Sequence, residues 1–153
     1  FRISGVSRAL THQLVRHRIA SYAQRSQRYC SEDGFKVILP PSIEKDYPSE
    51  CSYEHIVRNI DEAYAVLQNN SIPNEDARYI LPNACETSLY LSCNLRELIH
   101  LANERLCLRA QWEIRDLVKA MVALVPTELH FMLVPKCKSG RIICHENCGG
   151  KKE

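Results

Sequence analysis

Prolines limit the length of the secondary-structure elements that this chain can form. A proline has no backbone N–H and a fixed φ angle, so it stops a strand or a helix that reaches it. Pro40-Pro41 ends a strand predicted over 35–39, and Pro82 ends a short helix predicted over 74–81. No apolar run in the sequence approaches the ~20 residues that a membrane helix needs. We therefore expect strands and helices of ordinary length.

Hydrophobic periodicity predicts the remaining elements. Strands are expected over 1–6 and 87–93, and a loop or edge strand over 21–29. Ser7 is expected to cap a helix that runs to about His17. A turn over 48–52 precedes the other helices, which are predicted over 53–68, 94–106 and 112–124.

Composition is that of an ordinary globular protein. The 153 residues are 45% apolar and 25% charged, and this length suffices for one domain. The net charge of +2 is too small to predict bulk binding of nucleic acid. No signal peptide is evident, so a cytoplasmic location is expected. The sequence opens on an apolar stretch without Met, which predicts that it is the interior of a longer protein.

The stretch 16–28, RHRIASYAQRSQR, is strongly basic. It holds four arginines and one histidine but no carboxylate, whereas a solvated surface normally mixes both signs. Guanidinium groups form paired hydrogen bonds with phosphate, so this pattern favours a bound polyanion. A basic surface loop is the alternative from charge alone. As a binding module it would hold RNA or single-stranded nucleic acid, with Tyr22 and Tyr29 stacking on bases.

The helix expected over 94–106 has two distinct sides. Each residue turns a helix by about 100°. One side is apolar and is formed by Leu95, Leu98, Ile99, Ala102 and Leu106. A polar stripe beside it is formed by Arg96, His100 and Asn103, and Arg105 points roughly away from that stripe. Taken singly, each polar residue is typical of a solvated surface.

Eight cysteines are expected to be thiols rather than disulfides in a cytoplasmic protein. Five are scattered and are expected to be small buried residues. Cys137, Cys144 and Cys148 lie close together around His145, but their spacing is not a standard zinc pattern, so no metal is predicted. A mobile basic tail that includes Lys151-Lys152 is the preferred interpretation.

The spacing within the basic stretch resembles the signature of the flavin-dependent thymidylate synthases, the ThyX family. Arg16-His17-Arg18 is followed after seven residues by Ser26, Gln27 and Arg28. Similar blocks occur in the same order as SGVSRALTHQLVRHR before it and ARYILP, CNLRELIHL and AQWEIR after it. The resemblance covers the chain from Phe1 to about Leu124.

This resemblance implies a fold and a domain organisation. The fold is α/β (α+β), with a mostly antiparallel sheet flanked by helices. Residues 1–135 would form the catalytic domain, without the N-terminal segment that family members carry. Residues 136–153 would form a tail rich in Cys and Lys.

The resemblance also implies a reaction and its site residues. Such enzymes methylate dUMP to dTMP, with methylenetetrahydrofolate as the carbon donor and FAD, reduced by NADPH, as the hydride carrier. The implied FAD residues are Arg16, His17, Arg18, Asn94, Arg96 and His100. The implied dUMP residues are Gln13, Gln24, Ser26, Arg28, Arg78 and Arg105.

Individual residue types suit these implied roles. Ser26 and Arg28 suit the phosphate, and Arg105 suits the uracil carbonyls as a catalytic residue that stabilises negative charge on the ring. Gln24 stands where many family members carry an acid. None of the cysteines is expected to act as a nucleophile.

Family members are homotetramers with shared active sites, and the same is expected here, without a nucleic-acid or membrane partner. Arg96 and Arg105 project from opposite sides of one helix yet are assigned to neighbouring ligands. Each active site is therefore expected to take these two arginines from different subunits.

Overall fold

The computed structural model describes residues 1–140, 144–145 and 148. The chain forms two compact units. Unit 1 comprises Phe1, His12–Tyr22 and Leu91–Glu153, and unit 2 comprises Arg2–Thr11 and Ala23–Tyr90. The boundary expected between residues 135 and 136 remains a prediction.

A three-stranded sheet has the order β1-β3-β2. Its strands are β1 (Arg2–Ser7), β2 (Ala20–Gln24) and β3 (Glu86–Cys93). β1 runs antiparallel to β3, and the register shifts at Gly5, whose φ of 70° is easily reached only by glycine. The α/β (α+β) prediction is confirmed, and so are the three expected strand positions.

The helix α1 (Arg8–Leu14) begins as predicted and ends earlier. The Ser7 Oγ accepts a hydrogen bond from the Leu10 N–H at 3.0 Å, which confirms the N-cap. The helix stops at Leu14 rather than at His17, because the Tyr22 hydroxyl lies 2.8 Å from the Leu14 carbonyl oxygen and 2.9 Å from that of His17. These bonds satisfy carbonyls at a helix end.

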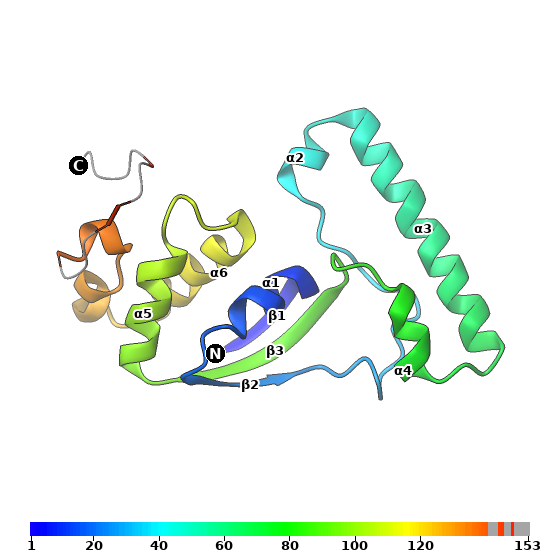
Figure 1. Cartoon of the computed structure of the whole chain (residues 1–153), viewed down its shortest axis with the longest axis horizontal. Coiled ribbons are helices and arrows are strands. Elements are labelled where there is room, and N and C mark those ends of the chain that lie inside the picture. The colour runs from blue at the N-terminus through cyan, green and yellow to red at the C-terminus, as the bar shows by residue number, and fades with distance from the viewer. Residues whose placement is uncertain (141–143, 146–147, 149–153) are drawn as a thin grey trace. The chain divides into compact units, whose positions relative to one another are not determined.

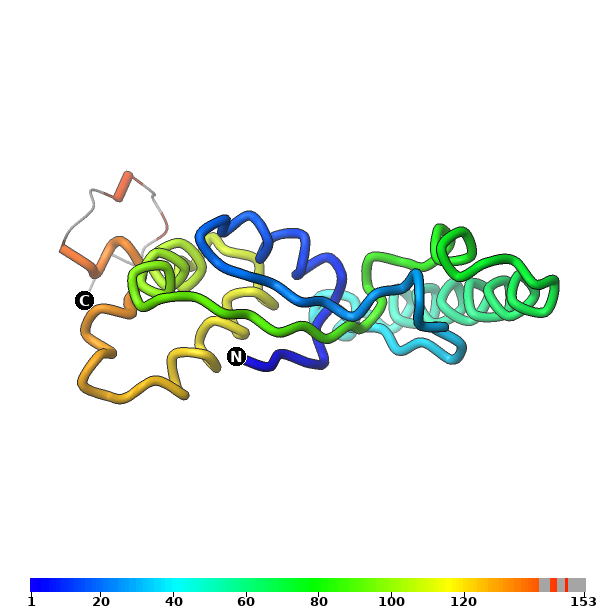
Figure 2. Tube along the Cα trace, turned by 90° about the horizontal axis from the view of Figure 1, so that it is seen from below, coloured from blue at the N-terminus to red at the C-terminus, as the bar shows by residue number. Residues whose placement is uncertain are grey.

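The 23-residue helix α3 (Tyr47–Asn69) is longer than predicted. Residues 48–52 form its first turn instead of a separate turn, because Pro48 lies at a position where its missing N–H costs nothing. Asp46 caps the helix and accepts a hydrogen bond from the Ser49 N–H at 3.2 Å. Two shorter helices, α2 (Pro41–Glu44) and α4 (Asn74–Ala77), lie beside α3 (Figures 1 and 2).

The strand predicted over 35–39 is wrong. This segment forms a single bridge between Val37 and Cys85, flanked by hydrogen bonds from the Ile38 N–H to Ala84 and from the Glu86 N–H to Lys36. Pro40 then directs the chain into α2, so the pairing cannot extend. A 3₁₀ turn, η1 (Arg78–Ile80), continues α4 and completes the helical segment expected before Pro82.

Unit 1 is built on α5 (Leu95–Arg105) and α6 (Trp112–Ala123), which pack together (Figure 1). Asn94 caps α5 by accepting a hydrogen bond from the Glu97 N–H at 2.9 Å. The short 3₁₀ helices η2 (Thr127–Met132) and η3 (Lys136–Lys138) follow. None of the helices in the described ranges is both long and apolar enough to cross a membrane.

The buried side of α5 differs from the predicted apolar side. Leu98 and Ala102 are buried as expected, but Leu95 is 40% exposed. Glu97 and Asn103 are instead 5% and 4% exposed, although Asn103 was assigned to the polar stripe. Asn103 donates to the Ile99 carbonyl of the same helix, and Glu97 faces His17, and hydrophobicity alone could not show either contact.

Candidate functional site

His17 lies at the centre of the polar arrangement in unit 1. It follows α1 and is 6% exposed. The Arg105 Nε donates a hydrogen bond to the His17 Nε2 at 2.9 Å, and the Arg105 Nη2 lies 3.4 Å from the Gln13 carbonyl oxygen. The His100 ring meets the His17 ring edge-on, with centroids 5.5 Å apart. Three predicted site residues, His17, His100 and Arg105, are thus brought together.

The contact with Arg105 fixes the protonation of His17. A guanidinium only donates hydrogen bonds, so Nε2 must carry a lone pair and the proton of the neutral imidazole lies on Nδ1. The His17 pKa is lowered from its ordinary 6.5 to about 4 by burial and, to a smaller extent, by the positive charges of Arg105 and His100, opposed by Glu104. His17 is therefore neutral at pH 7.

A buried carboxylate faces the other nitrogen of His17. The Glu97 Oε1 lies 3.7 Å from Nδ1, and both side chains are 6% exposed. This distance is too long for a hydrogen bond, and Nδ1 has no hydrogen-bond partner. The Glu97 carboxylate is therefore placed to accept the Nδ1 proton, but it does not form a hydrogen bond at this distance.

His17, Glu97 and His100 place three possible metal-ligand atoms within 4.8 Å of one another, and no other such group occurs among the described residues. Nδ1 carries a proton while Nε2 accepts from Arg105, so His17 offers no lone pair to a metal in this arrangement. These residues therefore do not fit a metal site. The tail residues Cys137, Cys144, His145 and Cys148 form no ligand group in the described ranges, and Lys151-Lys152 lie outside them.

Tyr22 braces the turn that presents His17. Its hydroxyl lies within hydrogen-bond distance of the Leu14 and His17 carbonyls. The Tyr22 pKa is raised to about 12 by burial and, to a smaller extent, by the nearby Glu97 and Cys93, so the hydroxyl stays a donor. The stacking role considered for Tyr22 is weakened, because its polar end is used inside unit 1.

The remaining candidate flavin residues surround this centre in sequence but differ in their contacts. Arg16, Arg18 and Arg96 are exposed, and none of their side chains has a hydrogen bond or ion pair with any residue in the described part of unit 1. Asn94 uses one lone pair of its Oδ1 to cap α5, which leaves its Nδ2 and the second lone pair for a ligand.

In unit 2, two of the predicted dUMP residues meet one glutamate. The Arg28 Nε and Nη2 lie 2.8 and 2.7 Å from the Glu75 Oε2, and the Arg78 Nε donates to the Glu75 carbonyl oxygen at 3.0 Å. The Ser26 Oγ accepts a hydrogen bond from the Arg28 N–H at 3.2 Å. We call these three residues, Ser26, Arg28 and Arg78, the cationic corner of unit 2. The Arg28 guanidinium in this corner is paired with the Glu75 carboxylate.

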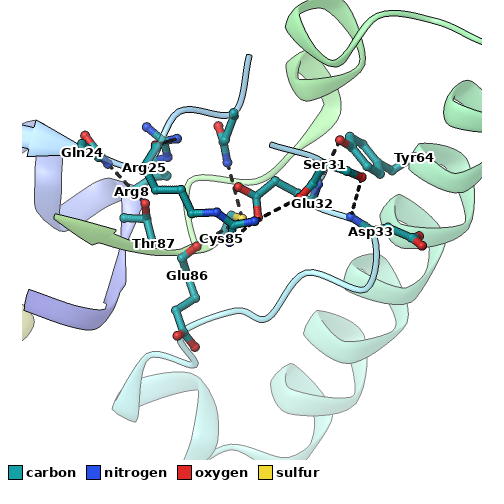
Figure 3. Close-up of polar contacts among 11 residues, drawn as sticks. Arg8, Gln24, Arg25, Ser31, Glu32, Asp33, Tyr64, Cys85, Glu86 and Thr87 are labelled. Carbon is teal, nitrogen blue, oxygen red and sulfur yellow. Dashed lines mark hydrogen bonds and ion pairs between the residues drawn. The ribbon is translucent and has the colours of Figure 1, made fainter. Parts of the chain in front are cut away.

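Arg25 serves the interior of unit 2 rather than a ligand (Figure 3). Its Nη1 lies 3.3 Å from the buried Glu32 carboxylate, and its Nη2 donates to the Ser31 carbonyl at 3.1 Å. The Arg8 Nη2 in turn donates to the Arg25 carbonyl at 3.1 Å. Burial raises the Glu32 pKa, while the charges of Arg25 and Arg8 oppose that rise. Arg25 is not among the implied ligand residues, and this ion pair accounts for its place in the basic stretch.

The glutamines of the stretch also form hydrogen bonds within unit 2, as Figure 3 shows for Gln24. The Gln24 Nε2 donates to the Thr11 hydroxyl at 3.1 Å and lies 3.5 Å from that of Thr87, so a ligand would have to meet its Oε1. The Gln27 Nε2 lies 3.6 Å from the Cys85 sulfur. Burial, followed by the charge of Glu32, raises the Cys85 pKa to about 11, which keeps it a thiol.

Sequence reasoning missed the three glutamates that organise these contacts. Glu32 and Glu75 lie outside the basic stretch, so a count of charges within it could not find them. Glu97 had a detectable signal, because it lies three residues after the Asn94 cap. That signal indicates helix capping and gives no hint of His17.

The chain is similar to known proteins of one family. The family model described as thymidylate synthase complementing protein matches residues 1–129. A flavin-dependent thymidylate synthase of Geobacter sulfurreducens is 48% identical over 127 residues, which cover 82% of this chain and 55% of that protein. Its counterpart in Clostridium tetani is 41% identical and covers all of this chain and 70% of that protein.

The fold is also similar to a solved structure. Thymidylate synthase X of Helicobacter pylori, crystallised with FAD and dUMP, superposes with a TM-score of 0.69 at 27% identity. The match covers 86% of this chain and 69% of that one. The chain spans about half the length of the first curated relatives that it matches, at 55% and 54%.

Proposed function

Because the chain belongs to the family of thymidylate synthase complementing proteins, we propose that it acts in the flavin-dependent methylation of dUMP to dTMP. Methylenetetrahydrofolate would donate the carbon, and FAD reduced by NADPH would carry the hydride. The observation that supports this most is the contact between Arg105 and His17, which lie 88 positions apart and belong to the two motifs that the proposal requires.

The residues of unit 1 fit a flavin dinucleotide. Arg16, Arg18 and Arg96 present exposed guanidinium groups, which suit a pyrophosphate. His17, His100 and Asn94 complete the proposed set and offer neutral polar edges. Bound FAD would supply the hydride chemistry, and these side chains would bind and orient it.

The cationic corner of unit 2 fits the phosphate of dUMP. Arg28 and Arg78 supply charge, and the Ser26 hydroxyl supplies a further donor. Glu75 now holds Arg28, so a phosphate dianion has to displace this carboxylate or share Arg28 with it. Gln24 would contact the ribose through its Oε1.

Arg105 is proposed as the catalytic residue toward the uracil ring, with Gln13 beside it. Its Nε donates a hydrogen bond to His17, and its Nη2 donates one to the Gln13 carbonyl. Its Nη1 is therefore left for a uracil carbonyl. Both partners are neutral, so the positive charge of Arg105 stays available. A fixed donor of this kind stabilises negative charge that builds on the ring as hydride arrives.

A homotetramer with shared active sites and a cytoplasmic location are part of the same proposal. Arg96 and Arg105 project from opposite sides of α5, which supports the sharing. Two of the four arginines in the basic stretch are paired with carboxylates, which weakens the nucleic-acid alternative.

The proposal is tested by measuring dTMP formed from dUMP in the presence of FAD, NADPH and methylenetetrahydrofolate. We expect dTMP only when all components are present, and a flavin absorption band on the purified protein. The Arg105→Lys variant keeps the charge but loses the fixed fork, so it should bind both ligands and form dTMP at least about tenfold more slowly. A folded, FAD-loaded chain that forms no dTMP would contradict the proposed activity.

A further inference from the structure

Glu97 is a buried carboxylate that none of the proposed ligand contacts uses. It lies in the first turn of α5, where the helix dipole favours a negative charge. Its side chain is 6% exposed. Burying a carboxylate is costly unless a donor compensates for the lost water.

The strongest donor available to Glu97 is the Nδ1–H of His17. Tyr22 and Cys93 also lie close enough to feel its charge. The Tyr22 hydroxyl, however, is directed to two backbone carbonyls, and a thiol is a weak donor. The His17 Nδ1 lies 3.7 Å from Glu97 and has no hydrogen-bond partner. It is therefore the group whose proton Glu97 can attract.

The position of the His17 proton decides whether Arg105 is held. With the proton on Nδ1, Nε2 accepts the Arg105 Nε–H, as observed at 2.9 Å. With the proton on Nε2, two donors would face each other and the contact would break. A carboxylate beside Nδ1 favours the first tautomer, as carboxylates do for catalytic and metal-binding histidines.

We propose that Glu97 is a positioning residue: its carboxylate holds the proton on Nδ1 of His17, so that Nε2 orients the Arg105 guanidinium toward the uracil ring. The role of Arg105 toward uracil rests on the proposed function, whereas the Glu97–His17–Arg105 arrangement does not. Glu97 meets the exposed cofactor residues only through its backbone N–H, which donates to Asn94, and its carboxylate is left for His17.

The arrangement is tested by NMR on the ¹⁵N-labelled chain, without ligands. The His17 ring nitrogens report the tautomer, and the Arg105 Nε–H reports its hydrogen bond through exchange with water. We expect the Nδ1–H tautomer and slow exchange in the wild type. Glu97→Gln keeps the shape but removes the charge, so it should mix the tautomers and speed the Arg105 exchange about tenfold.

Two further variants separate positioning from general stability. Glu128→Gln makes the same chemical change at an exposed glutamate of η2 and should leave both signals unchanged. Glu97→Asp keeps the charge on a shorter side chain and should restore the wild-type tautomer in part. In the enzyme assay, Glu97→Gln should lower kcat about tenfold with little change in the KM for dUMP.

The outcomes distinguish the two proposals. An Nε2–H tautomer in the wild type would overturn the role of Glu97 without any variant, and so would unchanged signals in a folded Glu97→Gln chain. If the NMR results are as expected but the wild type forms no dTMP, the arrangement stands and the proposed function fails.

Discussion

The central arginine of unit 1 is held by neutral groups, whereas two arginines of unit 2 are held by carboxylates. Arg105 contacts the imidazole of His17 and the carbonyl of Gln13. In unit 2, Arg25 is paired with Glu32 and Arg28 with Glu75. The charge of Arg105 is thus available to a ligand at once, while the charge of Arg28 is already balanced.

This difference has a consequence for binding. An anion that meets Arg105 gains a full charge interaction without displacing an acid. A phosphate that meets Arg28 must compete with Glu75, although this pair is about half exposed and therefore weak. Under the proposed function, Arg105 would meet its ligand without losing an ionic partner, whereas Arg28 would have to exchange one anion for another.

The largest expected effect is the loss of dUMP affinity when Arg28, the arginine paired with Glu75, is removed. Arg28→Ala loses a forked, charged contact with the phosphate and leaves a dianion with fewer donors, so dUMP affinity should fall about a thousandfold. FAD affinity should not change. Calorimetric titration of both ligands measures this, with Arg16→Ala as the reverse control that weakens FAD alone. Unchanged dUMP binding in Arg28→Ala would remove Arg28 from the site.

His17, the neutral imidazole that contacts Arg105, should make the free energy of unfolding depend on pH. The folded-state pKa of His17 is lowered from 6.5 to about 4, so between these values the unfolded chain binds more protons. Stability is therefore lost as pH falls from about 6.5 to about 4, by at most about 3 kcal/mol. Urea unfolding at several pH values measures this.

Two histidine variants isolate that contribution. His17→Gln should flatten the loss between pH 6.5 and pH 4, although it also lowers stability overall. His12→Gln, at an exposed position of α1, should keep the wild-type pH dependence. If both variants follow the wild-type curve, His17 does not stay neutral in the folded chain.

Removing the competing carboxylate should have a smaller effect of opposite sign. Glu75→Gln no longer attracts Arg28 as an ion, so dUMP affinity should rise by up to about fivefold, the value of an exposed ion pair. Asp76→Asn, the exposed neighbour, should change it less. Weaker dUMP binding in Glu75→Gln would show that Glu75 positions Arg28 instead of competing for it.

The smallest effect is expected at Cys85, a buried thiol of unit 2. Its raised pKa disfavours the thiolate, so Cys85→Ala should keep turnover and lose only about 1 kcal/mol of stability through the smaller side chain. Cys51→Ala, at an exposed site, should change neither property. Loss of turnover in a folded, FAD-loaded Cys85→Ala protein would make the thiol a participant.

Local patterns predicted the elements of this chain, but the pairings depended on distant residues. The Ser7 cap and the strands followed from short-range rules. The single bridge at Val37 depended instead on pairing with the distant Cys85. The motif spacing identified Arg16–Arg18, Arg28 and Arg105 as candidates. It could not show that Glu75 pairs with Arg28, 47 positions away, or that Glu97 faces His17, 80 positions away. Glu32, which pairs with Arg25, lies just outside the basic stretch.

The absorption spectrum of the FAD-loaded chain during a titration with dUMP tests the account most directly. A flavin responds when a neighbouring ligand changes its surroundings, so we expect a saturable shift of the flavin band in the wild type. The shift should require far more dUMP in Arg28→Ala. A folded chain that takes up no FAD, or whose bound flavin is unaffected while calorimetry shows that dUMP binds, would contradict it.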